Sequence, residues 1–244
     1  MLASLVAHTL FYRAAPMLSA LALPQTYGRM SAEDKKGWAV SLTSLSHCVI
    51  DVWFLFAYFG DPALNGDKMD GTNRAFEWYL AVALGYYVWD LTLCIRDYAQ
   101  YGLMYAIHGG LGVFGLLILT SEQLQFYAFP YLLPELSSIF LHARHLLKYA
   151  GHTGGIVYKA NFAVFLVTYV ATRVGFEAYY SVILVATVTR GETGAVFYPY
   201  AVFFAVLGIT LTVLNTIWLR QIINAAYYTL AKQPTKKRPE TKAD

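Results

Sequence analysis

Residues 101–121 read YGLMYAIHGGLGVFGLLILTS. A helix needs about 20 mostly apolar residues to cross the hydrocarbon core of a bilayer, and this stretch has that length and character. It nevertheless contains an ionisable side chain, His108, followed directly by Gly109 and Gly110, which are weak helix formers. Because an ionisable group is costly in hydrocarbon, it normally faces the interior of a bundle or a wet cavity. The stretch therefore predicts a helical membrane protein and raises the question of a site inside it.

The composition of the whole chain agrees with this prediction. Its 244 residues are 57% hydrophobic and only 14% charged, and the mean hydropathy is +0.44. About a quarter of the residues of a soluble domain are charged. We expect an all-α, polytopic membrane protein with about seven transmembrane helices around a central polar, lipid-binding cavity. The expected helices cover residues 2–23, 38–59, 75–95, 101–121, 124–147, 156–188 and 196–228. The sixth is too long for one perpendicular span, so we expect it to tilt, bend or extend into the interface.

Basic residues indicate the orientation of the bundle. They concentrate in the loop at 24–37, in the third and fifth connections and in the C-terminal tail, whereas the opposite loops have few. The positive-inside rule then places the N-terminus in the lumen or outside and the C-terminus in the cytosol. Residues 1–231 form one transmembrane domain in this interpretation, and residues 232–244 form a basic, disordered cytosolic tail. The formal charge of +3 comes largely from that tail, which favours a solvated segment over a nucleic-acid site.

The N-terminus lacks the pattern of a cleaved signal, so we expect the first span to be retained. Cys48 and Cys94 both fall inside expected spans, which gives little support to a disulfide or a thiol site.

Polar residues inside the expected spans recur at helical spacing. Six of the helices each have one polar or small-residue face, and such faces can meet only around a common interior. The members of these faces include His47 and Asp51, Tyr86 and Asp90, Tyr105 and His108, Glu135, Ser138 and His142, Arg173 and Glu177, and Asn215. With the orientation above, the sequence predicts a pocket that opens toward the cytosol or the inner leaflet.

Several of these residues also have a purely structural interpretation. His47 and Asp51 are one helical turn apart and can satisfy each other, and Arg173 and Glu177 have the spacing of an ion pair. His142 and His145 can lie at the interface, and the tyrosines can form an interfacial belt. His108 differs, because no charged residue lies within one turn of it on its own helix. We expect its partner to come from another helix.

Metal and cofactor chemistry has little support in the sequence. Six histidines are too few for the histidine boxes of a di-iron membrane enzyme, and the only tight pair is His142 with His145. A single-metal site from that pair and Glu135 is the remaining alternative, so we expect neither metal nor cofactor. The last expected span has no lysine for a retinal Schiff base, and no phosphate loop or serine-hydrolase elbow is found.

Six segments occur in a suggestive order: WAVSLTSLSHCVID, YYVWDLTLCIRD, YAIHGGLGVF, LPELSSIFLHARHLL, NFAVFLVTYVATRV and VLNTIWLRQI. Over about residues 38–225 the chain resembles the TLC domain family, which includes the ceramide synthases. The resemblance implies a helical bundle around a lipid cavity, usually in the endoplasmic reticulum. Ceramide synthases transfer an acyl group from acyl-CoA to the amine of a sphingoid base. They use two adjacent histidines in the span that matches residues 101–121, and acidic residues in the next helix. His108 matches one histidine, its neighbours Ile107 and Gly109 depart from the pattern, and Glu135 stands at an acidic position.

The first functional hypothesis is therefore a lipid acyltransferase that acts on a sphingoid or other lipid amine. His108 is the expected base or nucleophile, oriented by Asp90 or Glu135. Acyl-CoA is the expected co-substrate, membrane lipids and a long-chain acyl group are the expected partners, and a homodimer is compatible with the sequence. The residues expected to bind substrate are His47, Asp51, Tyr86, Tyr105, Ser138, His142, Arg173 and Asn215.

Two further hypotheses remain open. The missing second histidine favours a non-catalytic, lipid-binding regulator of membrane composition, which keeps the cavity without a strict need for His108. The carboxylates of Asp51, Asp90 and Glu177 also allow a lipid or solute transporter, or a receptor-like bundle.

Overall fold

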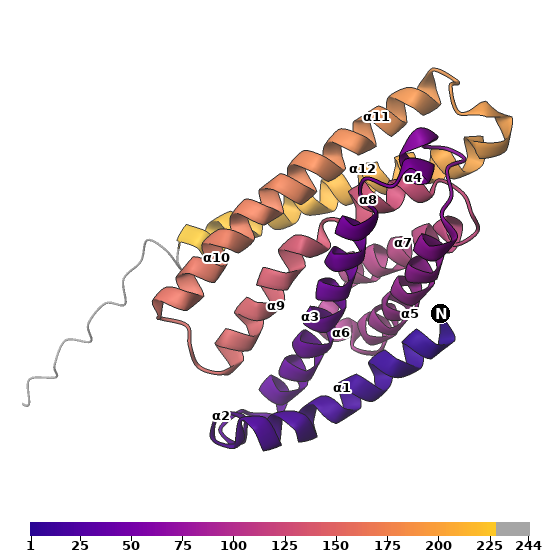
Figure 1. Ribbon diagram of the computed structural model, residues 1–244. Coiled ribbons are helices and arrows are strands. Elements are labelled where there is room, and N and C mark those ends of the chain that lie inside the picture. The colour runs from indigo at the N-terminus through magenta and orange to yellow at the C-terminus, as the bar shows by residue number, and fades with distance from the viewer. Residues whose placement is uncertain (228–244) are drawn as a thin grey trace, which may run out of the picture.

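The computed structural model describes residues 1–227, and every regular element in that range is helical (Figure 1). The tail predicted at 232–244 lies outside the described residues. The elements are α1 (Leu2–Ala22), α2 (Pro24–Gly28), α3 (Ala32–Tyr58), α4 (Pro62–Gly66), α5 (Arg74–Arg96), α6 (Tyr98–Tyr101), α7 (Leu103–Leu119), η1 (Gln125–Tyr127), α8 (Ala128–Leu132), α9 (Glu135–Tyr149), α10 (Ile156–Tyr169), η2 (Val170–Glu177), α11 (Ala178–Thr189) and α12 (Gly194–Ala226).

Four of the described helices are long and apolar enough to cross a membrane. They are α3, α5, α12 and the continuous helix Ile156–Thr189 that α10, η2 and α11 form together; α7 is apolar but shorter. The chain is therefore an integral membrane protein with multiple apolar helices. The count of seven spans and the orientation stay predictions. In particular, α9 has 15 residues, fewer than the about 20 that a perpendicular span needs.

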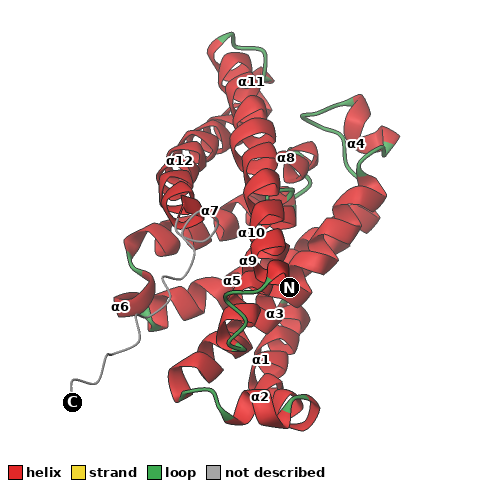
Figure 2. Ribbon diagram, turned by 90° about the vertical axis from the view of Figure 1, so that its left-hand side faces the viewer, coloured by secondary structure: helices red, strands yellow, loops and turns green. Residues whose placement is uncertain are grey.

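The long helices pack side by side around a common interior. In Figures 1 and 2, α1 lies across α3 and α5, α9 lies between α3 and α10, and α12 follows α11. α5 also packs along α7, which brings His108 toward the interior. Buried aromatic and leucine side chains from α5, α7, α8 and α12 form the main apolar core.

The loop expected at 24–37 is wrong, because α3 begins six residues earlier than predicted. Ser31 caps the helix: its hydroxyl accepts a hydrogen bond from the Asp34 N–H (3.0 Å) and donates one to the Asp34 carboxylate (2.7 Å). A serine followed three residues later by an acidic side chain is a local start signal for a helix. Because this first turn is charged, hydropathy alone does not place it inside the helix.

The single helix expected at 124–147 is also wrong. Leu124 has a left-handed backbone (φ 53°) and starts a short turn, and a second break at Leu133 and Pro134 separates α8 from α9. Proline lacks the N–H that a helix interior requires, so it is tolerated where a helix begins. The break makes Glu135 the first residue of α9, where the unpaired N–H groups of a helix start favour an anion.

The sixth expected helix is continuous, but its middle turns, Val170–Glu177, are π-helical. Such i→i+5 segments are rare and often occur at functional sites. Here the segment contains two buried ionisable side chains, Arg173 and Glu177, which reach different neighbours.

Gly110 and Gly112 on α7 provide a matched test of this packing. A Cβ at position 112 would stand 2.6 Å from Cδ1 of the buried Tyr87 ring, whereas a Cβ at position 110 would meet no atom within 4 Å. We expect Gly112→Ala to lower the thermal stability of the purified protein, since overpacking costs about 1–3 kcal/mol. Gly110→Ala should leave stability equal or slightly higher, because alanine is the better helix former. Equal effects of the two substitutions on the unfolding temperature would contradict the close approach of α5 and α7.

Candidate functional site

A cavity of about 480 Å³ lies between α3, α5, α7, α9, the long helix from α10 to η2, and α12. This volume is in the range of small-molecule sites, about 300–1,000 Å³. Of the residues expected in the site, eight line it: His108, Asp90, Glu135, Tyr86, Tyr105, Ser138, His142 and Arg173. His47, Asp51 and Asn215 do not line it.

A second, narrower cavity of about 40 Å³ lies next to the first and shares lining residues with it. Its walls are mostly apolar and come from α7, α8 and α12, with Gly112 and Gly115 among the lining residues. Four residues line both spaces: Tyr87, His108, Glu135 and Arg173. We call this set the junction. The candidate catalytic histidine thus stands where a wide, polar chamber meets a narrow, apolar one.

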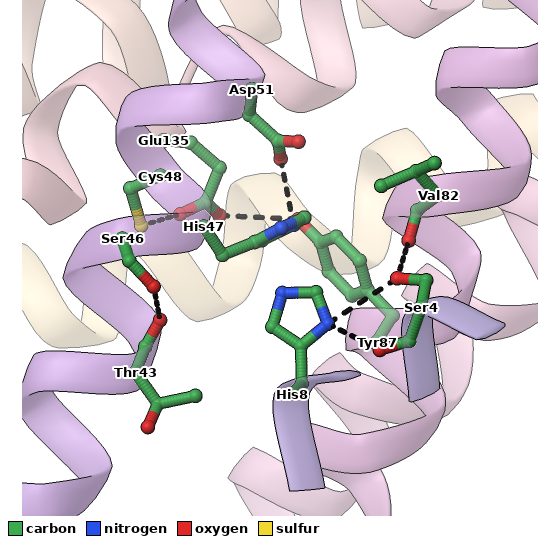
Figure 3. Close-up of polar contacts among 10 residues, drawn as sticks. All are labelled: Ser4, His8, Thr43, Ser46, His47, Cys48, Asp51, Val82, Tyr87 and Glu135. Atoms are coloured by element: carbon green, nitrogen blue, oxygen red, sulfur yellow. Dashed lines mark hydrogen bonds and ion pairs between the residues drawn. The ribbon is translucent and has the colours of Figure 1, made fainter. Parts of the chain in front are cut away.

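Glu135 is held at the junction by two donors from other helices. The Cys48 thiol on α3 donates to Oε2 (3.0 Å), and the Tyr87 hydroxyl on α5 donates to Oε1 (3.2 Å) (Figure 3). Because each carboxylate oxygen has a donor, the side chain is fixed although it lies deep in the bundle. The charge of Arg173 is also close enough to act on this carboxylate.

Arg173 reaches from η2 to the first turn of α9. Its Nε donates to the Ser137 hydroxyl (3.1 Å), and its Nη2 donates to the Ser138 hydroxyl (3.0 Å) and to the Pro134 carbonyl (3.4 Å). The expected ion pair with Glu177 is wrong: in residues 1–227 the Glu177 carboxylate instead accepts a hydrogen bond from Asn215 Nδ2 on α12 (2.9 Å). The two side chains therefore tie the π-helical segment to two different helices.

His108 packs edge-on against Trp218 of α12, with the ring centroids 5.5 Å apart. Its Nδ1 is buried and has no hydrogen-bond partner within residues 1–227. His108 was expected to have a partner on another helix. Asp90 and Glu135 line the same chamber as His108, but neither forms a hydrogen bond with it. Asp90 also lines the chamber, and no hydrogen bond or ion pair occupies its carboxylate within that range.

His47 and Asp51 lie behind the wall of the chamber. Both side chains are fully buried, with His47 Nε2 and Asp51 Oδ2 3.1 Å apart. The ring of His47 stacks on Tyr86, with centroids 3.7 Å apart, and meets the ring of His8 edge-on. Figure 3 shows His8, His47 and Asp51 next to the Glu135 contacts. The pair connects α3 to α5 and α1, and its predicted part in substrate binding would have to act through Tyr86.

Two pairs of charged or ionisable side chains lie in the chamber wall or close to it in sequence. His142 and His145 both line it, with ring centroids 6.1 Å apart. The described residues contain no group of three histidine, cysteine or acidic side chains placed to hold a metal ion.

Lys36 on α3 forms an ion pair with Asp97 (3.0 Å) beside the end of α5. Hydrogen bonds from Arg96 and Lys36 hold the pKa of Asp97 below its usual value.

Three residues that hold the site together are not among the predicted site residues. Cys48, Tyr87 and Ser137 supply three of the hydrogen bonds that hold Glu135 and Arg173. Cys48 follows Ser44 by one helical turn, so the polar stripe of its helix contained a signal for it. Nothing in the sequence distinguishes Tyr87 from its neighbour Tyr86, because only packing decides which hydroxyl reaches Glu135.

The His47–Asp51 pair makes a testable contribution to stability. Removing one member of a buried pair leaves the other without compensation, which typically costs about 3–5 kcal/mol. We expect His47→Leu and Asp51→Leu each to lower the unfolding temperature strongly, and the double variant to lose less than the sum of the two. The measurement is a double-mutant cycle by thermal unfolding in detergent or nanodiscs. Strictly additive losses would show that the two side chains do not interact.

Comparison with known proteins identifies the family. The TLC domain family matches residues 37–224, so the chain belongs to it. An uncharacterised TLC domain-containing protein of Schizosaccharomyces pombe is 23% identical over 88% of this chain and 75% of its own length. TLC domain-containing protein 1 of Gallus gallus is 31% identical over 66% of each chain. The human protein CLN8 is 23% identical over 89% of this chain and 79% of its own.

Proposed function

Because the chain is a TLC domain protein, we propose that it is a membrane lipid acyltransferase. It transfers an acyl group from acyl-CoA to a sphingoid base or another lipid amine, and His108 is the base or nucleophile. The observation that carries this proposal is the position of His108 at the junction, where the polar chamber meets the apolar one. An acyl thioester has the same division, with a polar carrier on one side of its carbonyl carbon and methylene groups on the other.

Each half of the substrate has a place in this arrangement. The narrow cavity takes the methylene groups next to the carbonyl, because leucines, Phe204 and two glycines make up most of its walls, with Tyr131 and Glu177 as polar members outside the junction. The wide chamber takes the carrier and the acceptor, with Tyr105, Ser138 and His142 among its polar lining groups. Its size and polar lining suit a headgroup. The carbonyl carbon then lies beside His108.

The reaction needs one proton acceptor. His108 takes a proton from the acceptor amine as the amine nitrogen attacks the carbonyl carbon, and the carbon–sulfur bond breaks. The proton then passes from the imidazolium to the leaving thiolate, which yields an amide and free CoA. In the nucleophilic variant, His108 attacks the carbonyl carbon first, and the CoA thiolate leaves as the acyl-imidazole forms. The amine then attacks the acyl-imidazole carbonyl, the imidazole leaves, and the amine proton passes to the thiolate. With Nδ1 sealed from the cavity, Nε2 is the nitrogen that performs either step.

Two carboxylates assist in this proposal. Asp90 has no protein partner in the described range, so it is available to bind the acceptor's amine. Glu135 is already held by Cys48 and Tyr87, and its negative charge stabilises the imidazolium that forms on His108. The proposal also places the protein in the endoplasmic reticulum, with the chamber open toward the cytosol. It includes a homodimer as the assembly.

A non-catalytic, lipid-binding regulator is the second candidate. One observation favours it: among the described residues no carboxylate contacts His108, so nothing sets its tautomer before a ligand binds. This candidate keeps the chamber and the junction and predicts bound lipid without turnover.

The test is acyl transfer by the purified protein in vesicles that contain sphingoid bases and phosphatidylethanolamine. Long-chain acyl-CoA is added and the lipid products are identified by mass spectrometry. We expect His108→Ala to lower turnover by about 10²- to 10⁴-fold, the usual contribution of a general base. Glu135→Gln should lower it less, because the amide still accepts hydrogen bonds but lacks the charge.

His152→Ala is the matched control, since His152 lies in the exposed connection between α9 and α10, away from the chamber. It should retain wild-type turnover. Absence of transfer to every acceptor, together with equal amounts of co-purified lipid in wild type and His108→Ala, would overturn the acyltransferase and support the regulator.

A further inference from the structure

We infer that Arg173 is an anion-binding group at the junction, and that it receives the carboxylate of a long-chain fatty acid or the carbonyl oxygen of an acyl chain as that oxygen becomes negative. The binding part of this inference stands on geometry alone. The catalytic part rests on the proposed function and extends it by one residue.

The guanidinium is fixed, yet one of its nitrogens is free. Nε and Nη2 donate to Ser137, Ser138 and the Pro134 carbonyl, which holds the planar group in one orientation. The other terminal nitrogen, Nη1, has no hydrogen-bond partner in residues 1–227, nor is it among the atoms sealed from solvent there. An arginine carries five donors in a rigid fork, so a tethered guanidinium presents its unused N–H groups in a defined direction.

The charge of Arg173 has no contacting counter-ion. The side chain is 8% exposed, and in the described part of the chain no carboxylate lies within ion-pair distance of it. The two candidates are engaged elsewhere: Glu135 accepts from Cys48 and Tyr87, and Glu177 accepts from Asn215. Arg173 thus has neutral acceptors, the ring of Tyr169 and the nearby charge of Glu135, but no carboxylate in contact. A buried cation without a contacting carboxylate, inside a membrane protein, favours an anion at its unused donor.

The location selects the kind of anion. Arg173 lines both the polar chamber and the narrow apolar cavity. A ligand at this point has a negative oxygen at the junction and an alkyl chain beyond it, which is the description of a fatty carboxylate. His108 lines the same two spaces, so an acyl carbonyl group at the junction lies in a site that both His108 and Arg173 line. A preorganised donor aimed at a developing oxyanion accelerates acyl transfer.

The test compares two ligands of equal chain length, palmitate and hexadecanol. Binding is measured on the full-length protein in nanodiscs for wild type and Arg173→Gln. We expect Arg173→Gln to weaken palmitate binding about 10- to 100-fold, the effect of losing a charged hydrogen bond. Hexadecanol binding should change less than about twofold, because it carries no charge for Arg173 to bind.

Arg144→Gln is the matched control. Arg144 lies on α9, stacks on Phe162 and does not line the chamber. Its removal changes the net charge equally, so palmitate should bind the variant as it binds wild type. Equal palmitate affinity in wild type and Arg173→Gln, or an equal loss of palmitate and hexadecanol, would overturn the inference.

A third variant covers the case in which Arg173→Gln does not fold. Ser137→Ala with Ser138→Ala keeps the charge and removes two of the three tethers. We expect this variant to bind palmitate more weakly than wild type and Arg144→Gln do, by less than about tenfold. Unchanged affinity in this variant would contradict a preorganised site.

Turnover separates this inference from the proposed function. If wild type transfers no acyl group but still binds palmitate in an Arg173-dependent way, the acyltransferase fails and the anion site stands. If wild type turns over and Arg173→Gln keeps the same kcat and the same palmitate affinity, the anion site fails and the acyltransferase stands. A fall in kcat with little change in KM for acyl-CoA supports the oxyanion role.

Discussion

The structure depends on the pairing of ionisable groups inside a membrane, where water does not supply hydrogen bonds. Each unsatisfied polar group in hydrocarbon costs several kcal/mol, so such groups must find protein partners. Glu135 meets this requirement with donors from α3 and α5, and Arg173 meets it with acceptors on α9. These contacts join four elements that are distant in sequence, and they fix the walls of the chamber.

The same requirement separates scaffold from candidate site. His47 and Asp51 are fully buried and 3.1 Å apart on α3, and the His47 ring packs against rings of α1 and α5. The carboxylate of Asp90 and Nη1 of Arg173 are different, because no protein hydrogen bond or ion pair satisfies them in the described range, and both residues line the chamber. Polar groups that line a cavity and lack a protein partner are positions where a ligand supplies the missing interactions.

The π-helical segment and the proline break place these residues. The break at Pro134 starts α9 at Glu135, and the segment Val170–Glu177 sends Arg173 to that same first turn. Both irregular stretches thus meet at the junction. The two irregular stretches are therefore what brings Arg173 to the first turn of α9. This agrees with the frequent occurrence of π-helical turns at functional sites.

The sequence by itself determined the class of the protein and the members of its interior. Mean hydropathy, helical spacing and one polar face per helix predicted an all-α membrane bundle, and eight of the eleven predicted site residues line the chamber. Both results follow from local periodicity and the cost of burying polar groups. Only the tertiary structure decided which polar side chains form hydrogen bonds with one another. Arg173 pairs with serines rather than with Glu177, and Cys48 and Tyr87, not His108, contact Glu135. Such choices depend on the depth and rotation of packed helices, which local spacing does not encode.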